Sequence, residues 1–118
     1  MIVKIHSWIQ NKSEKRSVSF EGKGILNKQV LSFVENENHN ELRLENNKIT
    51  LRRRINHTEE FYFTFLEQEY TTLEYTGSVG KLEIPLYTEQ IVHEDGKIEI
   101  NYILNEQEEF SFKITYEM

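Results

Sequence analysis

Two charged side chains occupy positions that the alternation of apolar residues assigns to the inner face of a predicted sheet. Glu35 lies two residues after Phe33, and Arg53 lies two residues after Leu51. An unpaired ion in an apolar interior costs several kcal/mol, so we expect Glu35 and Arg53 within about 8 Å of each other, or each beside another polar partner. The planar guanidinium of Arg53 suits a ligand carboxylate or phosphate. A water-covered structural ion pair at the end of the domain explains the same two residues.

Four more polar side chains share this inward position and complete the set of candidate ligand-binding residues. The set is Glu35, Arg53, Tyr75, Thr88, Tyr102 and Tyr116. Barrels of about eight to ten strands can hold one small ligand among such groups. Six phenylalanines on the same face could fill a small barrel by themselves. A filled core and a ligand cavity therefore both remain open.

Residue types that perform ordinary catalysis are absent or scattered. The chain has no cysteine, which excludes a thiolate nucleophile, a disulfide and sulfur-ligated zinc. The four histidines lie in separate segments without metal-motif spacing, and the single aspartate, Asp95, precedes Gly96 in a turn. Neighbouring glutamates such as Glu59 and Glu60 point in opposite directions along a strand, so they cannot share a proton. We predict no catalytic residue, no metal site and no cofactor.

The arginines at positions 52–54 and the aromatic residues at 61–65 are together typical of a nucleic-acid surface. Successive side chains of a strand face opposite ways, however, so Arg53 should turn inward while Arg52 and Arg54 face solvent. The chain also carries 20 acidic and 14 basic side chains, for a net charge of -6, which repels phosphate backbones and anionic membranes. We predict neither nucleic acid nor membrane as a partner.

Strands must position these side chains. The 118 residues include no alanine but 26 valines, isoleucines and threonines, and apolar residues alternate in segment after segment. We predict strands near residues 2–9, 16–21, 29–36, 41–45, 48–55, 59–66, 69–76, 80–92, 97–104 and 109–117. The phenylalanines at 61, 63 and 65 should be largely buried side by side.

Short turns join the predicted strands into one domain over residues 1–118. The turn signals are Asn38–Asn40, Asn46–Asn47, Asn56–Thr58, Gly77–Gly80, Asp95–Gly96 and Asn105–Gln107. Such links are too short for parallel crossovers, so the fold class is all-β: an antiparallel up-and-down meander of about eight to ten strands. Closure of the first strand on the last, as in a calycin or lipocalin-like barrel, removes both exposed edges.

Two of the turns predict a strand register. A two-residue loop at Asn46–Asn47 brings opposite charges and apolar residues together: it pairs Glu41 with Arg52, Leu42 with Leu51 and Leu44 with Ile49. At Asp95–Gly96 a two-residue loop would reverse the inward face of Leu82, Ile84 and Leu86. A bulged turn at Gly96 avoids this and pairs Leu86 with Leu104, Thr88 with Tyr102 and Val92 with Ile98.

The chain resembles the YwiB-like proteins, an uncharacterised bacterial family with a calycin-type β-barrel. The resemblance rests on residues 30–35, on Arg53 with its alternating neighbours, on Tyr75 followed by Gly80, and on the alternation at 82–88 and 98–104. It implies a calycin-like barrel in a bacterial, cytoplasmic protein and implies no reaction. This chain departs from the family at Phe33, where an aromatic hydroxyl is usual, and at Ile55, where a glycine is usual.

The leading functional hypothesis is a non-enzymatic protein of unknown function that binds a small, partly apolar ligand, with Arg53 available to an anionic group. A protein-interaction module is the rival hypothesis, an enzyme comes third, and a homodimer is left open. The rival rests on outward apolar residues, namely Trp8, Val30, Val34, Tyr62, Leu66 and Ile103. The N-terminal residues lack a basic segment followed by a long apolar run, so we expect a cytoplasmic location.

Overall fold

The computed structural model describes residues 1–118 and contains ten β-strands. They are β1 (Ile2–Asn11), β2 (Arg16–Asn27), β3 (Val30–Glu35), β4 (Asn38–Leu44), β5 (Lys48–Ile55), β6 (Glu59–Leu66), β7 (Tyr70–Gly77), β8 (Gly80–Glu94), β9 (Lys97–Leu104) and β10 (Glu108–Glu117). Each strand pairs antiparallel with the next, and β1 pairs with β10 to close a barrel. The predicted all-β meander and its closure are confirmed. No helix capable of crossing a membrane is present.

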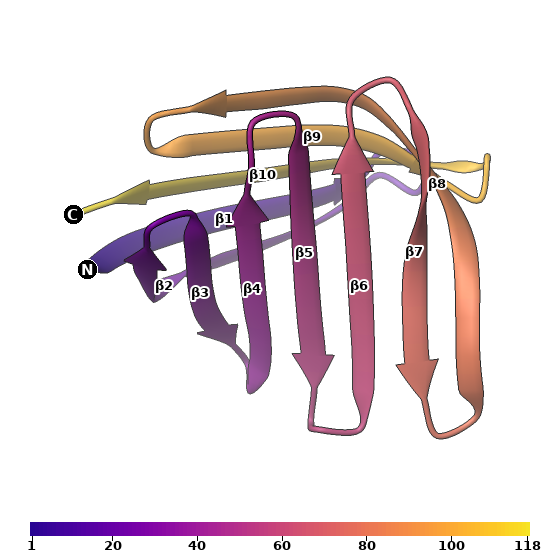
Figure 1. Ribbon diagram of the computed structural model, residues 1–118, viewed down its shortest axis with the longest axis horizontal. Helices are drawn as coiled ribbons and strands as arrows, with labels where there is room; N and C mark the ends of the chain where they lie inside the picture. The colour runs from indigo at the N-terminus through magenta and orange to yellow at the C-terminus, as the bar shows by residue number, and fades with distance from the viewer.

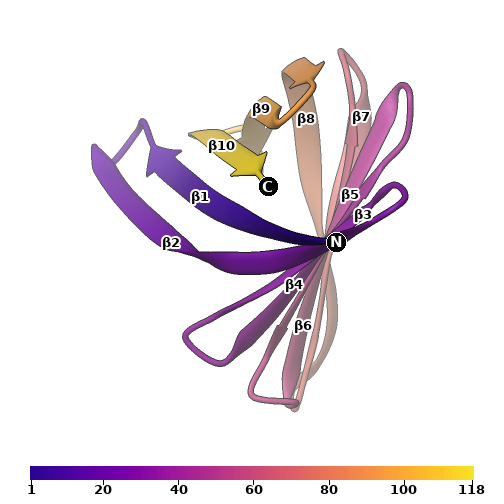
Figure 2. The ribbon, with the colours of Figure 1, turned by 90° about the vertical axis from the view of Figure 1, so that its left-hand side faces the viewer.

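The barrel is flattened into two layers whose strands cross steeply (Figure 1). In that view β3 to β7 run up and down in front, while β1, β9 and β10 run across behind them. β8 belongs to both layers, because its first half pairs with β7 and its second half pairs with β9. Figure 2 shows β1 and β2 curving away from the layer of β3 to β7. Strands that bend from one sheet into the other form the corners of such orthogonal packing.

β2 makes the second corner where it passes close to its neighbours. It pairs with β1 from Arg16 to Ile25 but with β3 only from Gly24 to Asn27. A Cβ atom on Gly24 would overlap the side chain of Ile5 and lie 2.6 Å from the carbonyl oxygen of Ser32. Glycine therefore permits the close backbone approach at this bend. The strand predicted over residues 16–21 was too short, since β2 continues to Asn27.

The hairpin predicted at Asn46–Asn47 has the expected register. Leu44 pairs with Ile49 and Glu41 pairs with Arg52 across β4 and β5. The turn predicted at Asn38–Asn40 was wrong, because these residues begin β4. The turn lies at Asn36 and Glu37, whose φ angles are +50° and +70°. Positive φ at both central residues matches the twist of a tight two-residue hairpin. Here a glutamate, Glu37, adopts the positive φ at the second position.

The bulge predicted at Gly96 was misplaced. Glu94 pairs with Lys97 and His93 with Ile98 across a two-residue turn, so Val92 does not pair with Ile98. The register shifts instead between Thr88 and Gln90, and beyond that point the predicted pairs of Thr88 with Tyr102 and Leu86 with Leu104 are present. One extra residue in β8 therefore restores the inward face. It does so at the corner of the barrel, where the strand must bend in any case.

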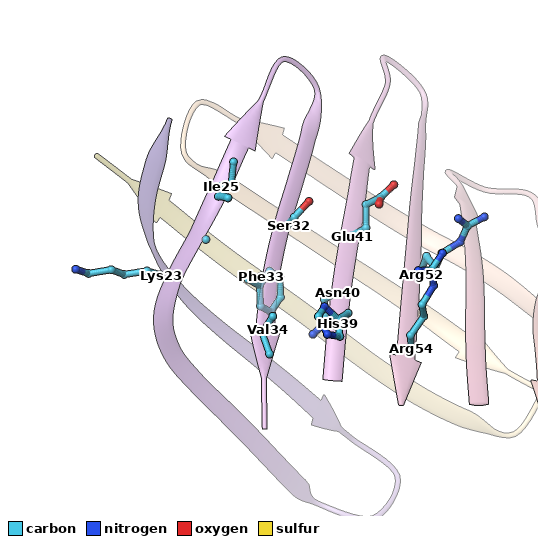
Figure 3. Close-up of a pocket in the computed structure, with 11 residues that line it drawn as sticks. Lys23, Ile25, Ser32, Phe33, Val34, His39, Asn40, Glu41, Arg52 and Arg54 are labelled. Carbon is cyan, nitrogen blue, oxygen red and sulfur yellow. The ribbon is translucent and has the colours of Figure 1, made fainter. Parts of the chain in front are cut away.

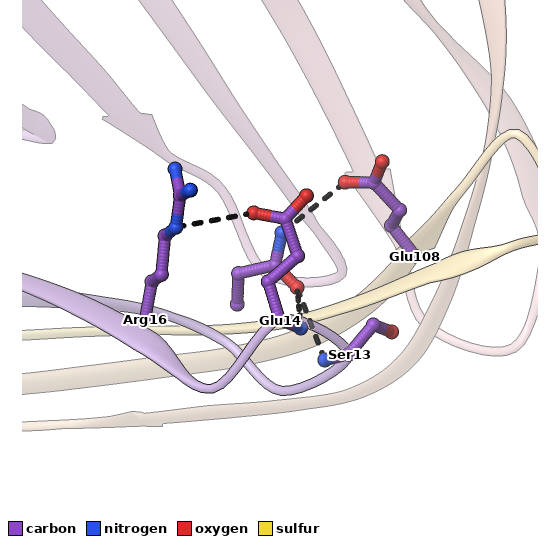
Figure 4. Close-up of polar contacts among 5 residues, drawn as sticks. Ser13, Glu14, Arg16 and Glu108 are labelled. Atoms are coloured by element: carbon purple, nitrogen blue, oxygen red, sulfur yellow. Dashed lines mark hydrogen bonds and ion pairs between the residues drawn. The ribbon is translucent and has the colours of Figure 1, made fainter.

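The hairpin of β1 and β2 is held against β10 by polar contacts (Figure 4). The side-chain oxygen of Asn11 accepts hydrogen bonds from the backbone N–H groups of Ser13 and Glu14, at 3.0 and 3.1 Å. The side-chain amide of Asn11 donates to Glu108 at 3.2 Å, and Arg16 lies 3.5 Å from Glu14. These contacts are exposed, so they order the turn more than they stabilise the fold.

The apolar core lies between the two layers and follows the predicted alternation in most strands. The fully buried side chains are Phe65, Leu31, Leu42, Ile49, Leu86, Ile98, Ile100, Ile114 and Thr88. Phe61 and Phe63 are half-buried, so only Phe65 of the three is completely enclosed. Leu82, expected inside, is 57% exposed because the end of the β7–β8 hairpin extends past the end of β9.

Candidate functional site

Glu35 and Arg53 are neighbours, as the sequence predicts. Glu35 ends β3 opposite Asn38, and Arg53 lies on β5 opposite Asn40, so the two side chains meet diagonally across β4. An Nη2 atom of Arg53 lies 3.7 Å from an Oε2 atom of Glu35. That separation is too long for a hydrogen bond, and the Nε atom of Arg53 is buried without a partner. The Arg53 side chain is 24% exposed, so the guanidinium keeps donors that a ligand could use.

Arg53 lines a cavity of about 280 Å³ on the inner face of the barrel, between the two layers and open to solvent. The lining residues are Ile9, Leu51, Arg53, Ile55, Phe61, Phe63, Phe65, Tyr102 and Phe112. Eight of the nine are hydrophobic, so Arg53 is the only charged group on the wall. An apolar hollow with one well-placed polar group is the usual form of a small-molecule site.

Tyr102 lines the same cavity as Arg53. Its ring centroid lies 5.0 Å from that of Phe65 and stacks at 5.2 Å on Phe110. Burial raises the pKa of Tyr102 far above its ordinary value, although the positive charge of Arg53 acts in the opposite direction. The hydroxyl therefore stays protonated and can donate a hydrogen bond, but it cannot serve as a base near neutral pH.

The other three candidate residues do not line this cavity. The Tyr75 ring packs against the lining residue Phe61, with centroids 5.0 Å apart. The Tyr75 hydroxyl donates to Glu59 at 2.5 Å, and this hydrogen bond is the main reason that the pKa of Tyr75 is raised. Thr88 is fully buried at the β8 corner, and its hydroxyl has no partner. Tyr116 lines a separate hollow beside the β8–β9 turn. The structure thus unites Glu35, Arg53 and Tyr102 and separates the rest.

Sequence reasoning missed the apolar residues that complete the cavity wall from the back layer, chiefly Ile9 on β1. Alternation placed Ile9 on the inward side of its strand, so a signal existed. Nothing in the sequence, however, distinguished a residue on the wall of a cavity from a residue in a filled core. Asn40 was also missed, since it was assigned to a turn. It is buried between Phe33 and Arg53, and its amide donates to the backbone oxygen of Asn38 at 3.3 Å.

The arginines on either side of Arg53 point outward, as predicted. Arg52 and Arg54 border a shallow hollow of about 390 Å³ on the outer side of β2 to β5 (Figure 3). Both of their Nε atoms lie near one oxygen of Glu60, at 3.1 and 3.4 Å. Glu60 therefore offsets part of their charge, and nothing in this arrangement resembles a continuous basic surface.

The outward apolar residues proposed as an interaction surface do not form one patch. They lie on β1, β3, β6 and β9, and at least one other strand separates each of these from the next around the barrel. The Trp8 ring is also covered by Lys113, and the Tyr62 ring by Arg52.

Comparison with known proteins assigns the chain to a family. The profile described as "Domain of unknown function (DUF1934)" matches residues 3–118. The chain belongs to this family. The "Crystal structure of ywiB protein from Bacillus subtilis" is similar with a TM-score of 0.74 and 20% sequence identity, over 98% of this chain and 89% of that chain. No curated protein matches the chain.

Membership of the DUF1934 family confirms the resemblance to YwiB-like proteins seen in the sequence, and the solved relative shows the same barrel fold. At 20% identity the likeness carries no residue roles. The family itself has no assigned function. What this DUF1934 barrel does must therefore be argued from its own cavity.

Proposed function

We propose that this DUF1934 barrel is a non-enzymatic binding protein for a small, largely apolar monoanion, whose anionic group contacts Arg53. The observation that carries the proposal is the Nε atom of Arg53, which is buried without a partner on the wall of an otherwise hydrophobic cavity. An unsatisfied buried donor costs about 1 to 3 kcal/mol, and more when it is charged. A small rotation of the guanidinium would expose this atom to the cavity, where a ligand oxygen would supply the missing acceptor.

The cavity limits the size and charge of the ligand. Its volume of about 280 Å³ equals roughly nine water molecules at about 30 Å³ each, so a compact ligand such as a substituted ring or a short branched chain fits. Phenylalanine rings favour flat or branched apolar groups. Glu35 already lies 3.7 Å from Arg53, so a second negative charge on the ligand would be repelled.

Titration with matched ligands tests this proposal. Isothermal titration calorimetry should show that benzoate binds at least about tenfold more tightly than benzamide, which has the same shape but no charge. Arg53→Met should remove this preference, whereas Arg54→Met should keep it, because Arg54 faces solvent on the same strand. Equal affinities for the two ligands in the wild-type protein, or loss of binding in Arg54→Met alone, would refute the role of Arg53.

Native mass spectrometry of the purified protein provides an independent measurement. A retained mass of a few hundred daltons or less supports an occupied cavity, whereas a stable dimer without a small ligand supports the rival interaction role. We also propose a cytoplasmic location, in keeping with the charged outer face of the barrel, and cell fractionation would test it.

A further inference from the structure

The outer surface of the barrel carries three sets of aromatic rings, and two of them are covered by a cation from the same chain. The Nζ atom of Lys113 lies 5.3 Å from the centroid of Trp8, and the Cζ atom of Arg52 lies 5.4 Å from that of Tyr62. The third set is Tyr70 and Tyr87, whose ring centroids are 4.8 Å apart. Neither of these rings has a lysine or arginine over it.

Tyr70 and Tyr87 form one side of a small pocket of about 180 Å³, which we call the Tyr70–Tyr87 pocket. It is lined by Tyr70, Pro85, Tyr87, Ile103 and Glu106. Tyr87 lies directly across the sheet from both Tyr70 and Ile103, and Pro85 shares the outer face of β8 with Tyr87. The strand ladder therefore holds the lining residues in place.

Glu106 brings a negative charge to the edge of this pocket. It lies in the β9–β10 turn, where the backbone N–H of the preceding Asn105 donates to the carbonyl oxygen of Pro85 at 2.9 Å. No ion pair within the chain involves Glu106. Tyr70 is 68% exposed, so its ring is open to a partner.

We propose that the Tyr70–Tyr87 pocket binds an organic cation, either a free alkylated ammonium compound or a lysine or arginine side chain of a peptide. The electron-rich faces of the tyrosines attract the cation, and Glu106 supplies the opposite charge. Pro85 and Ile103 contact the apolar part of the ligand. The volume of about 180 Å³ equals roughly six water molecules, which accommodates a group the size of choline. The net charge of -6 adds a general attraction for cations.

This inference does not depend on the interior cavity, and its test uses different ligands. Choline and 3,3-dimethylbutan-1-ol have the same shape, but only choline is charged. In ¹H–¹⁵N NMR titrations, choline should shift amides of β7, β8 and β9 around the pocket, and the neutral alcohol should bind at least about fivefold more weakly. A short lysine-containing peptide and its acetylated form make the second arm. Tighter binding of the peptide than of choline identifies a protein partner, and the reverse identifies a free cation.

Three variants locate the site. Tyr70→Leu and Glu106→Gln should each weaken choline binding by about fivefold, a change that fits an exposed cation–π contact or ion pair. Tyr62→Leu is the matched control, because Tyr62 is an outward tyrosine already covered by Arg52, and binding should be unchanged. The proposal is overturned if neither choline nor the peptide shifts these amides, if the neutral alcohol binds as well as choline, or if Tyr62→Leu weakens binding as much as Tyr70→Leu.

Discussion

The three phenylalanines on the inner face of β6 differ in burial, and they predict an unequal series of alanine substitutions. All three line the cavity, but Phe65 is 1% exposed and contacts Tyr102, whereas Phe61 and Phe63 are half-buried. Burying a large aromatic side chain removes about 150 to 250 Å² from water, which at about 25 cal/mol per Å² is worth roughly 4 to 6 kcal/mol. Alanine retains part of that area, so Phe65→Ala should cost about 4 kcal/mol. Phe61→Ala and Phe63→Ala should each cost about 2 kcal/mol.

Urea denaturation followed by circular dichroism measures this series. With a slope of about 2 kcal/mol per molar urea, Phe65→Ala should lower the midpoint by about 2 M and each of the other two by about 1 M. Should Phe65→Ala fail to fold, Phe65→Leu retains more volume and should still be the most costly of three leucine variants. Equal costs at all three positions, with unchanged slopes, would refute the link between the cavity and the partial burial of Phe61 and Phe63.

Three further predictions follow from buried groups. Burial holds the pKa of Tyr102 above its ordinary value of 10.0, so Tyr102 ionises more easily in the unfolded chain than in the folded one. The free energy of unfolding should therefore fall as the pH rises above about 10. Tyr102→Phe should lessen this fall, measured as the urea midpoint at each pH. Thr88→Val should leave the free energy of unfolding unchanged or raise it by up to about 1 kcal/mol, because the buried hydroxyl has no partner, and the melting temperature should follow. A fall in the free energy of unfolding of more than about 1 kcal/mol would contradict this. Gly24→Ala should cost about 1 to 3 kcal/mol in the same urea assay, since its Cβ would collide with Ile5 and the backbone of Ser32, and an unchanged midpoint would show that β2 can shift.

Local patterns were enough to predict most of the fold. Alternation between apolar and polar residues located all ten strands, because side chains of a strand alternate between its two faces whatever the strand packs against. The register at Asn46–Asn47 followed from pairing Glu41 with Arg52 and Leu42 with Leu51, which depends only on the two adjoining strands. The same parity placed Glu35 and Arg53 on one inner face, where each buried charge needed the other or another polar partner, and the structure pairs the two.

The sequence by itself therefore determined the strands and most turns, since each depends on neighbours along the chain or on one paired strand. It also indicated the closure of the barrel and a partner for each buried charge, since open edges and unpaired buried ions are costly. Only the tertiary structure decided where the bulge of β8 lies, how far its hairpin extends past β9, and which inward residues surround an open cavity. The two layers cross steeply, so Ile9 from the back layer comes to face Arg53 from the front layer. No periodicity within a strand encodes that crossing, because it arises from the bends of β2 and β8 at the corners. Thr88 on β8 and Tyr116 on β10 share the inward parity of Arg53 and yet lie outside the cavity that it lines.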